Sequence, residues 1–148
     1  MDGYSLLHNW LELAPGKPRH SAAAREELIH VLTRYHDASG TPVTIVFDGA
    51  RAAREKNETP SSTSVEVLYS HADQTADQMI ERAAYRLREY GEVLVMTDDF
   101  AERDTVISFG AMAFSCENFV CNVHDALDDL DRDIKNHNRR ERTRYGKH

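Results

Sequence analysis

The sequence has little cysteine, no long apolar run and no opening segment of the kind that directs secretion. Its two cysteines, Cys116 and Cys121, fall in one expected helix at a spacing that turns them to different faces, and a reducing cytoplasm is their simplest setting. No apolar stretch approaches the roughly 18 residues that a membrane span needs. No basic segment followed by an apolar one opens the chain. We therefore expect a cytoplasmic protein with no membrane partner.

Several enzyme classes lose support because their motifs are missing. Cys116, Cys121 and His124 share one expected helix, but no second Cys/His pair is present to complete a zinc site. Neither standard glycine-rich phosphate loop occurs. A G-x-S-x-G elbow is also missing, so a serine hydrolase is unsupported.

Charge is unevenly distributed along the chain. The 148 residues suffice for one domain with a single core, and their formal net charge is −7. Residues 135–148 carry six Lys and Arg against only Glu141, a net of +5, which leaves −12 on residues 1–134. We expect a domain over 1–134 and a basic tail over 135–148. An acidic body with a basic tail is typical of a protein that handles polyanions, although a solvated terminus explains the tail equally well.

Helical and extended patterns alternate along the sequence. Short apolar runs predict strands, and amphipathic segments bounded by Ser, Thr or Asp caps predict helices. The expected strands are 44–47, 65–69, 93–96 and 111–114, and the expected helices are 21–39, 75–90, 100–108 and 115–134, with a short helix or turn over 5–13. This order predicts a mostly parallel sheet with helices on both sides. The first strand of such a sheet is usually central, and no apolar run precedes Asp2 to supply it.

Acidic residues stand where several of these elements meet. The apolar run Val93–Met96 ends in Asp98 and Asp99, the run ending at Phe47 leads to Asp48, and Asp77 and Asp2 open two further segments. Ligand sites in open α/β sheets lie at the carboxyl ends of the strands. Helix capping explains each acid by itself, but it does not require four elements to bring acids to one edge.

Carboxylates that converge need a positive charge between them. Two carboxylates about 4 Å apart repel by roughly 4 kcal/mol at an effective dielectric near 20, so a cluster either takes up protons or binds a cation. Oxygen ligands of this kind suit Mg²⁺ or Mn²⁺. Such an ion polarises phosphoryl oxygens and activates water, which favours phosphate chemistry.

Five short motifs in this order resemble the YacP-like, NYN-domain branch of the PIN-type ribonucleases. The resemblance extends from Asp2 to about Phe119, and the order and spacing of the motifs make a chance match improbable. The motifs are Asp2-Gly-Tyr-Ser-Leu-Leu-His8, Val46-Phe-Asp-Gly49, Thr75-Ala-Asp77 with Ile80-Glu-Arg82, Val95-Met-Thr-Asp-Asp99 and Phe109-Gly-Ala111. The resemblance implies a Rossmann-like PIN/NYN three-layer sandwich, here without its first strand, and a Mg²⁺- or Mn²⁺-dependent endoribonuclease. Some relatives act on mRNA at the ribosome, so RNA is the implied partner.

The resemblance also assigns roles to residues. It implies Asp2, Asp48, Asp77 and Asp99 as catalytic metal ligands, with Asp98 as a secondary ligand, because the family commonly has a small polar residue at that position. Ser5 stands where the family usually has Asn and would reach a phosphate through water. Backbone contacts to RNA are expected from basic residues of one loop and of the tail, namely Arg51, Arg54, Lys56, Arg139, Arg140 and Arg142.

Two other functions are compatible with acids at strand ends. One is a non-catalytic RNA- or ribosome-binding module that keeps the same fold. The other is a receiver-type phosphoacceptor domain, which would need a Lys after its last strand. No Lys lies between Lys56 and Lys135, and this nearly excludes the receiver.

Overall fold

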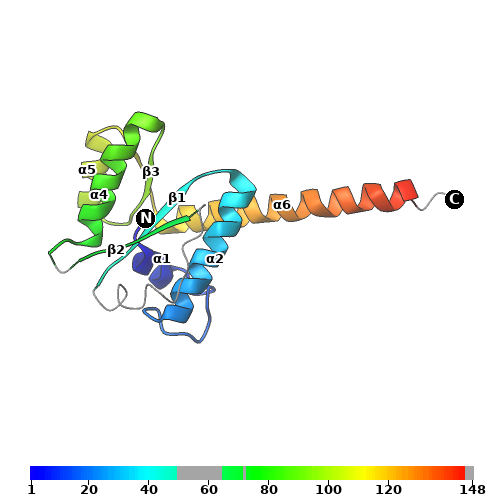
Figure 1. Cartoon of the computed structure of the whole chain (residues 1–148), viewed down its shortest axis with the longest axis horizontal. Coiled ribbons are helices and arrows are strands. Elements are labelled where there is room, and N and C mark those ends of the chain that lie inside the picture. Colours follow the sequence, from blue (N-terminus) through cyan, green and yellow to red (C-terminus); the bar gives the residue numbers. More distant parts are fainter. Residues whose placement is uncertain (50–64, 72, 146–148) are drawn as a thin grey trace.

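The protein is a mixed α/β chain whose helices and short strands alternate as expected. The computed structural model describes residues 1–49, 65–71 and 73–145. Its elements are α1 (Gly3–Asn9), α2 (Ala22–Ser39), β1 (Val43–Phe47), β2 (Val65–Tyr69), α4 (Ala76–Leu87), the 3-10 turn η2 (Arg88–Tyr90), β3 (Leu94–Met96), α5 (Phe100–Ser108), β4 (Met112–Phe114) and α6 (Cys116–Tyr145) (Figure 1). Each expected strand is present, and the helix expected over 100–108 has the same bounds in the structure.

The strands form two parallel pairs and not the single sheet that the sequence predicts. β1 pairs with β2, and β3 pairs with β4. Nothing in the described chain pairs β1 with β3. One residue contributes to the edge of β1 from outside the strands, because Asp2 forms an isolated parallel bridge with Val46. The parallel α/β character is therefore confirmed, whereas a continuous sheet is not formed.

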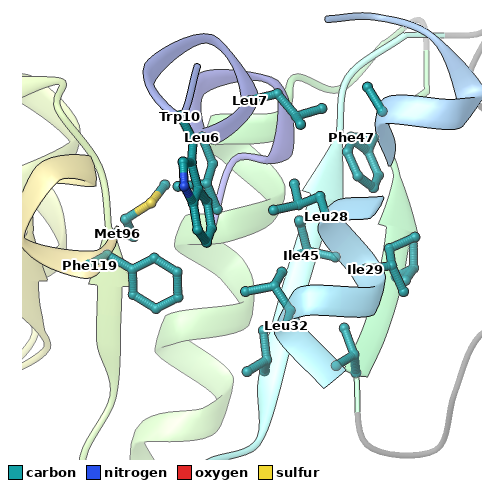
Figure 2. Packing of buried hydrophobic residues seen from close by; sticks show 14 of the residues in the cluster. Leu6, Leu7, Trp10, Leu28, Ile29, Leu32, Ile45, Phe47, Met96 and Phe119 are labelled. Atoms are coloured by element: carbon teal, nitrogen blue, oxygen red, sulfur yellow. The ribbon is translucent and has the colours of Figure 1, made fainter. Parts of the chain in front are cut away.

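Helices cover both faces of the strands and create two apolar cores. The larger core joins α1, α2 and the start of α6 to β1 and β2; Figure 2 shows Leu6, Leu28, Ile45 and Phe119 converging there. The smaller core joins α4 and α5 to Val46 and Val95. Neighbouring residues of β1 therefore enter different cores, as the alternation of a strand requires.

Caps set the beginning of the two long helices beside the strands, as the sequence predicts. Ser21 Oγ accepts from Ala24 N, and α2 ends at Gly40, which adopts the left-handed conformation with φ 73°. Thr75 and Gln78 form a complete capping box at the start of α4. The last turn expected for this helix, up to Tyr90, is the 3-10 turn η2.

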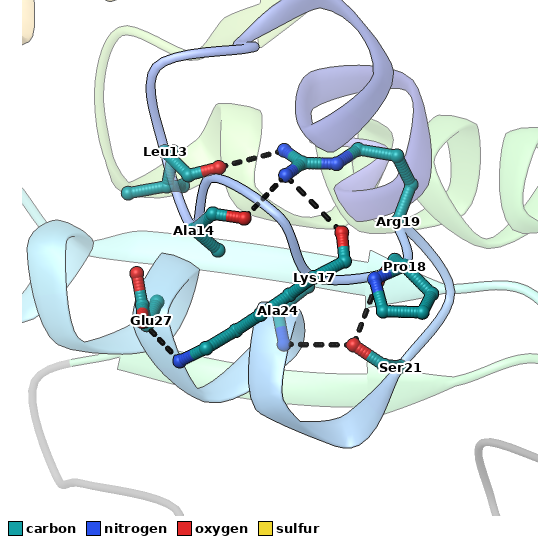
Figure 3. A network of polar contacts seen from close by, with 8 residues as sticks. All are labelled: Leu13, Ala14, Lys17, Pro18, Arg19, Ser21, Ala24 and Glu27. Carbon is teal, nitrogen blue, oxygen red and sulfur yellow. Dashed lines mark hydrogen bonds and ion pairs between the residues drawn. The ribbon is translucent and has the colours of Figure 1, made fainter.

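The segment after α1 is organised by one arginine. The helix expected over 5–13 spans Gly3–Asn9 instead, and Leu11, which lies beyond it, is 74% exposed. Arg19 donates to the carbonyl oxygens of Leu13 at 2.7 Å and Ala14 at 2.6 Å, contacts that Figure 3 shows. It also reaches the carbonyl oxygen of Trp10 at 3.2 Å, close to the end of α1. A cation at a helix C-terminus satisfies carbonyls that the helix leaves open.

The last helix is longer than the sequence analysis predicts. α6 continues past Ile134 to Tyr145 and projects from the body (Figure 1). The expected end near Ile134 is wrong, because the basic residues that follow have good helix propensity. The boundary between domain and tail therefore falls inside one helix. Residues 131–142 are all exposed, so this part of α6 adds little to either core.

Candidate acid site at the strand ends

Asp2 begins α1 and borders β1. Its Oδ1 accepts from the backbone N–H groups of Tyr4 at 3.1 Å and Ser5 at 3.2 Å. Immediately before it, the Met1 amino group donates to Thr44 O at 2.9 Å, and Val46 N donates to Met1 O at 2.8 Å. Met1 and Asp2 therefore lie along β1 as an extended segment. Burial lowers the pKa of the Met1 amino group to about 6.

Gly3 allows Asp2 to approach β1 closely. A Cβ placed on Gly3 would lie 2.6 Å from Cδ1 of Phe47, well inside van der Waals contact. The Phe47 ring is completely buried and packs against Tyr4 and Tyr69. It has little room to move aside, so the position of Asp2 depends on the missing side chain of Gly3.

Asp48 follows β1 and is held from the neighbouring strand. Its Oδ1 accepts a hydrogen bond from Ser70 Oγ, and the same hydroxyl oxygen accepts from Gly49 N at 3.1 Å. Ser70 is fully buried directly after β2. The hydrogen bond between Asp48 and Ser70 therefore links the carboxyl ends of β1 and β2.

Asp98 and Asp99 follow β3 and accept hydrogen bonds from the starts of two different helices. Asp99 Oδ1 caps α5 by accepting from Ala101 N at 2.8 Å. Asp98 Oδ1 accepts from Cys116 N at 2.9 Å, at the start of α6. Burial, followed by the contact with Asp98, raises the pKa of the Cys116 thiol to about 12. The thiol therefore stays protonated and is no nucleophile at neutral pH.

Asp77 lies beside a carboxyl group, that of Glu102, which is not among the acids predicted from the sequence. Glu102 is 4% exposed, and its Oε2 accepts from Thr97 Oγ1 at 2.9 Å. Its Oε1 is buried without a hydrogen-bond partner among the described residues. Burial, and then the neighbouring Asp77, raise the pKa of Glu102 to about 8. Burial beside a second carboxylate therefore favours the protonated form of Glu102 at neutral pH.

The position of Glu102 in the sequence predicts a different hydrogen bond from the one in the structure. It stands three residues after Asp99, the spacing of a capping box, and this spacing favours a side chain that folds back onto the helix start. In the structure the side chain turns to Thr97 instead. Only the tertiary contact between α4 and α5 brings it to Asp77.

Electrostatic interactions connect several of these groups. The Met1 amino group interacts with Glu102 and Asp2, and the Cys116 thiol interacts with Asp98 and Asp2. Asp2, Asp77, Asp98 and Glu102 therefore share one neighbourhood, whereas Asp48 and Asp99 show only their structural hydrogen bonds. Across residues 1–49, 65–71 and 73–145, no three His, Cys, Asp or Glu side chains are close enough together to hold a metal ion. The expected cage of four acids is thus not assembled in this structure.

The expected RNA contacts are divided between two places. Arg51, Arg54 and Lys56 lie outside the described residues. Arg139, Arg140 and Arg142 lie on the exposed part of α6, and Ser5 lies in α1, where its backbone N–H bonds to Asp2. No helix in the described ranges is both long and apolar enough to cross a membrane.

Parallel strands that end in acids, with helices on both sides, define a mixed α/β protein with an acidic edge. Residues 1–148 match the sequence profile of the YacP-like NYN domain, and the chain belongs to this family. NYN domains are nuclease-like, which suggests an RNA-related function. The uncharacterized protein YacP of Bacillus subtilis (strain 168) is 26% identical over 136 residues, which are 91% of this chain and 79% of that protein.

Two solved structures share the fold. The crystal structure of Rae1 (YacP) from Bacillus subtilis is 24% identical, superposes with a TM-score of 0.77, and is matched over 96% of this chain and 82% of that one. A crystal structure of a mutant of Rae1 gives a TM-score of 0.75 at 26% identity, over 91% of this chain and 79% of the other. The arrangement of helices and strands described above is therefore that of solved YacP structures.

Proposed function

We propose that the protein is a metal-dependent endoribonuclease whose acidic edge cleaves RNA phosphodiester bonds. The observation that carries the proposal is the neighbourhood of Asp2, Asp77, Asp98 and Glu102, supplied by four separate segments of a YacP-like NYN domain. The proposal includes two further points. The fold is a Rossmann-like PIN sandwich, and the substrate is RNA.

The donor set suits a hard divalent cation in charge and chemistry. All the candidate ligands are carboxylates, which Mg²⁺ and Mn²⁺ favour. The raised pKa of Glu102 and its unpartnered Oε1 mark a site with more negative charge than nearby donors neutralise. Asp77 and Glu102 would contribute to holding the ion, and Asp2, Asp48, Asp98 and Asp99 stay candidates for further ligands. Such an ion supplies polarisation of a phosphoryl oxygen and an activated water.

The protein's own groups would prepare the site for this chemistry. Thr97 fixes Glu102 through Oε2 and leaves Oε1 without a hydrogen-bond partner among the described residues. Asp2, Asp98 and Asp99 are each held through Oδ1 by backbone N–H groups, and a cap of this kind uses only one oxygen of the carboxylate. The chain thereby orients its acids without using their full capacity as ligands. Arg139, Arg140 and Arg142 would hold the RNA backbone.

Substitution by Asn tests the proposal because Asn also caps helices well. Asp99→Asn and Asp48→Asn should keep the fold and reduce cleavage of a labelled RNA by at least about 100-fold, as removal of a charge that stabilises the transition state does. Asp104→Asn, on the exposed side of α5, is the matched control and should cleave normally. EDTA should stop cleavage and Mn²⁺ should restore it.

The alternative is an RNA-binding module without catalysis. It predicts that the purified wild-type chain binds RNA but never cleaves it with either metal. Full cleavage by both Asn variants would exclude the acids as the catalytic groups.

A further inference from the structure

A small pocket lies beside the two acids that follow β3. Its volume is about 190 Å³, and it is lined by residues 97–100 and Arg103 on one side and by residues 113–115 on the other. Pockets for drug-sized ligands usually have roughly 300–1,000 Å³, so this pocket suits a single flat ring system. Because Asp98 and Asp99 belong to the lining, a ligand in the pocket lies next to the candidate acid site.

Phe100 presents an exposed aromatic ring at this pocket. It is the first residue of α5, its side chain is part of neither apolar core, and it is 76% exposed. Single exposed apolar side chains are common on protein surfaces, so exposure alone assigns no function to the ring. Phe100 also lines the pocket, however, and an aromatic face beside a cavity of this size provides a surface on which a nucleobase can stack.

A positive charge accompanies the ring. Arg103 follows Phe100 by three residues, so the two side chains lie on the same face of α5, and both line the pocket. The backbone N–H of Arg103 donates to Asp99 O at 2.9 Å, and its guanidinium forms no ion pair within residues 1–49, 65–71 and 73–145. A guanidinium binds phosphate through two parallel hydrogen bonds. The two side chains therefore offer a surface for a base and a charge for the phosphate attached to it.

The carboxylates of the lining select against a free anion. Asp98 and Asp99 are exposed at the pocket, so they would repel an isolated phosphate placed there. A ligand whose neutral part fills the pocket, with its phosphate held only at Arg103, avoids this repulsion. An unpaired nucleotide of RNA has this form, because its base can turn out from the charged backbone and stack on an aromatic side chain. The lining therefore favours single-stranded RNA over phosphate alone.

We propose that Phe100 and Arg103 form a binding site for one unpaired nucleotide of the RNA, with the base stacked on the Phe100 ring and its phosphate held by Arg103. The inference rests on the proposed function, since it takes RNA as the ligand. A nucleotide bound in this way brings the adjoining part of the strand to Asp98 and Asp99. Bases of a duplex are stacked inside the helix and cannot enter the pocket, so the site selects single-stranded segments.

Binding of a short single-stranded RNA that carries the fluorescent base 2-aminopurine tests the site. Titrations in EDTA, which removes divalent ions, measure binding without cleavage. Phe100→Ala should raise the Kd by about 10-fold, as loss of one stacked base does, and should abolish the fall in fluorescence that stacking gives in the wild type. Phe100→Trp should retain both the affinity and the quenching. Tyr90→Ala, which removes a ring on η2 that is 83% exposed, is the matched control and should bind RNA as the wild type does.

Salt dependence separates the roles of the two side chains. Arg103→Gln should flatten the slope of log K against log [salt] by about 0.7, the effect of one phosphate contact to a single strand, whereas Phe100→Ala should leave the slope unchanged. Both side chains are exposed, so the melting temperatures of both variants should match that of the wild type. RNA binding by the wild type, with the same affinity and quenching in Phe100→Ala, would overturn this site alone and leave the proposed function standing. A wild-type chain that binds no RNA would overturn the proposed function and this site with it.

Discussion

At the scale of single residues, the acids of the candidate site have structural and chemical roles at once. Asp2 and Asp99 cap α1 and α5, and Asp98 holds the start of α6. The competing explanation, helix capping, is thus correct for Asp2 and Asp99, whereas Asp48 bonds to Ser70 and Thr75 caps α4 in place of Asp77. A cap uses one carboxylate oxygen, so capping and ligation do not exclude each other. Glu102 differs from these acids because burial and Asp77 raise its pKa.

The first residue-scale prediction concerns the pH dependence of stability. With a pKa of about 8 in the folded state and 4.5 unfolded, Glu102 binds more proton in the folded state between these values. The free energy of unfolding therefore falls as pH rises from 4.5 to 8. Glu102→Gln should remove this loss and raise the melting temperature by about 3 °C at pH 8.5 in EDTA, with little change at pH 5.

A control separates Glu102 from other groups that titrate in this range. The Met1 amino group, with its pKa lowered to about 6, has the opposite effect, since it favours the folded state as pH rises from 6 to 8. Both proteins carry it, so the difference between wild type and variant reports Glu102 together with its interaction with the Met1 amino group. Glu89→Gln, on the exposed turn η2, should leave the profile unchanged. Parallel profiles for wild type and Glu102→Gln would contradict the raised pKa.

The second residue-scale prediction concerns Gly3. Replacing Gly by Ala inside a helix ordinarily stabilises it by about 0.5–1 kcal/mol. Here the new Cβ would meet the buried Phe47 ring. Gly3→Ala should therefore destabilise the protein by about 1–3 kcal/mol, as overpacking does, measured by denaturant unfolding. Combining it with Phe47→Leu should cost less than the two changes added together. If Gly3→Ala stabilised the protein, the Phe47 ring would have to move aside for the new Cβ, and the prediction would be wrong.

At the scale of elements, α4 positions Asp77. Its capping box fixes the first turn, and Asp77 lies in that turn, where a carboxylate also interacts favourably with the helix dipole. Ile80 and Ala84 then bury the helix against Val46 and Val95. The cap and the core together determine where Asp77 meets Glu102.

Removing the cap tests this dependence. Thr75→Ala should lower the free energy of unfolding by about 1 kcal/mol and reduce cleavage because Asp77 loses its fixed turn. Thr75→Ser, which keeps the hydroxyl acceptor, should retain most of the stability and most of the cleavage activity. Circular dichroism melts and the RNA cleavage assay measure the two effects. Equal losses in the Ser and Ala variants would assign the effect to the lost methyl group instead of the cap.

At the scale of the whole molecule, an acidic body carries a basic helical arm. Residues 135–148 hold a net charge of +5, and their described part continues α6 away from the strands. Residues 131–142 are exposed, so this stretch adds little to the core. Charge of this sign on an exposed helix is suited to the phosphate backbone of RNA.

Neutralising the arm should weaken RNA binding in a salt-dependent way. Arg139→Gln, Arg140→Gln and Arg142→Gln together keep the helix but remove three positive charges. The slope of log K against log [salt] should flatten by about 0.7 for each phosphate that the arm no longer neutralises, while the melting temperature stays unchanged. Deleting residues 135–148 should produce the same direction of change. An unchanged slope in both variants would leave the arm without a role in RNA binding.

The local structure of this protein can be predicted from neighbouring residues alone. Ser21, Thr75 and Asp99 predict the starts of three helices because a cap depends on groups only a few residues away. The short apolar runs likewise predict all four strands, since a run of this kind is a local pattern. The end of α6 was misjudged because an exposed helix shows no apolar periodicity to mark where it stops.

Tertiary structure alone decided how the pieces meet. The separation of the strands into two pairs depends on what lies between β1 and β3, and a cavity there is a property of packing that no local pattern reveals. Glu102 joins Asp77 only because α4 and α5 pack together, which makes its pKa a long-range effect. The acids could be selected from their positions after strands, but their distances from one another follow from how the two strand pairs and their helices pack. Capping is local and the packing of strand pairs is not, and this is the physical reason for the difference.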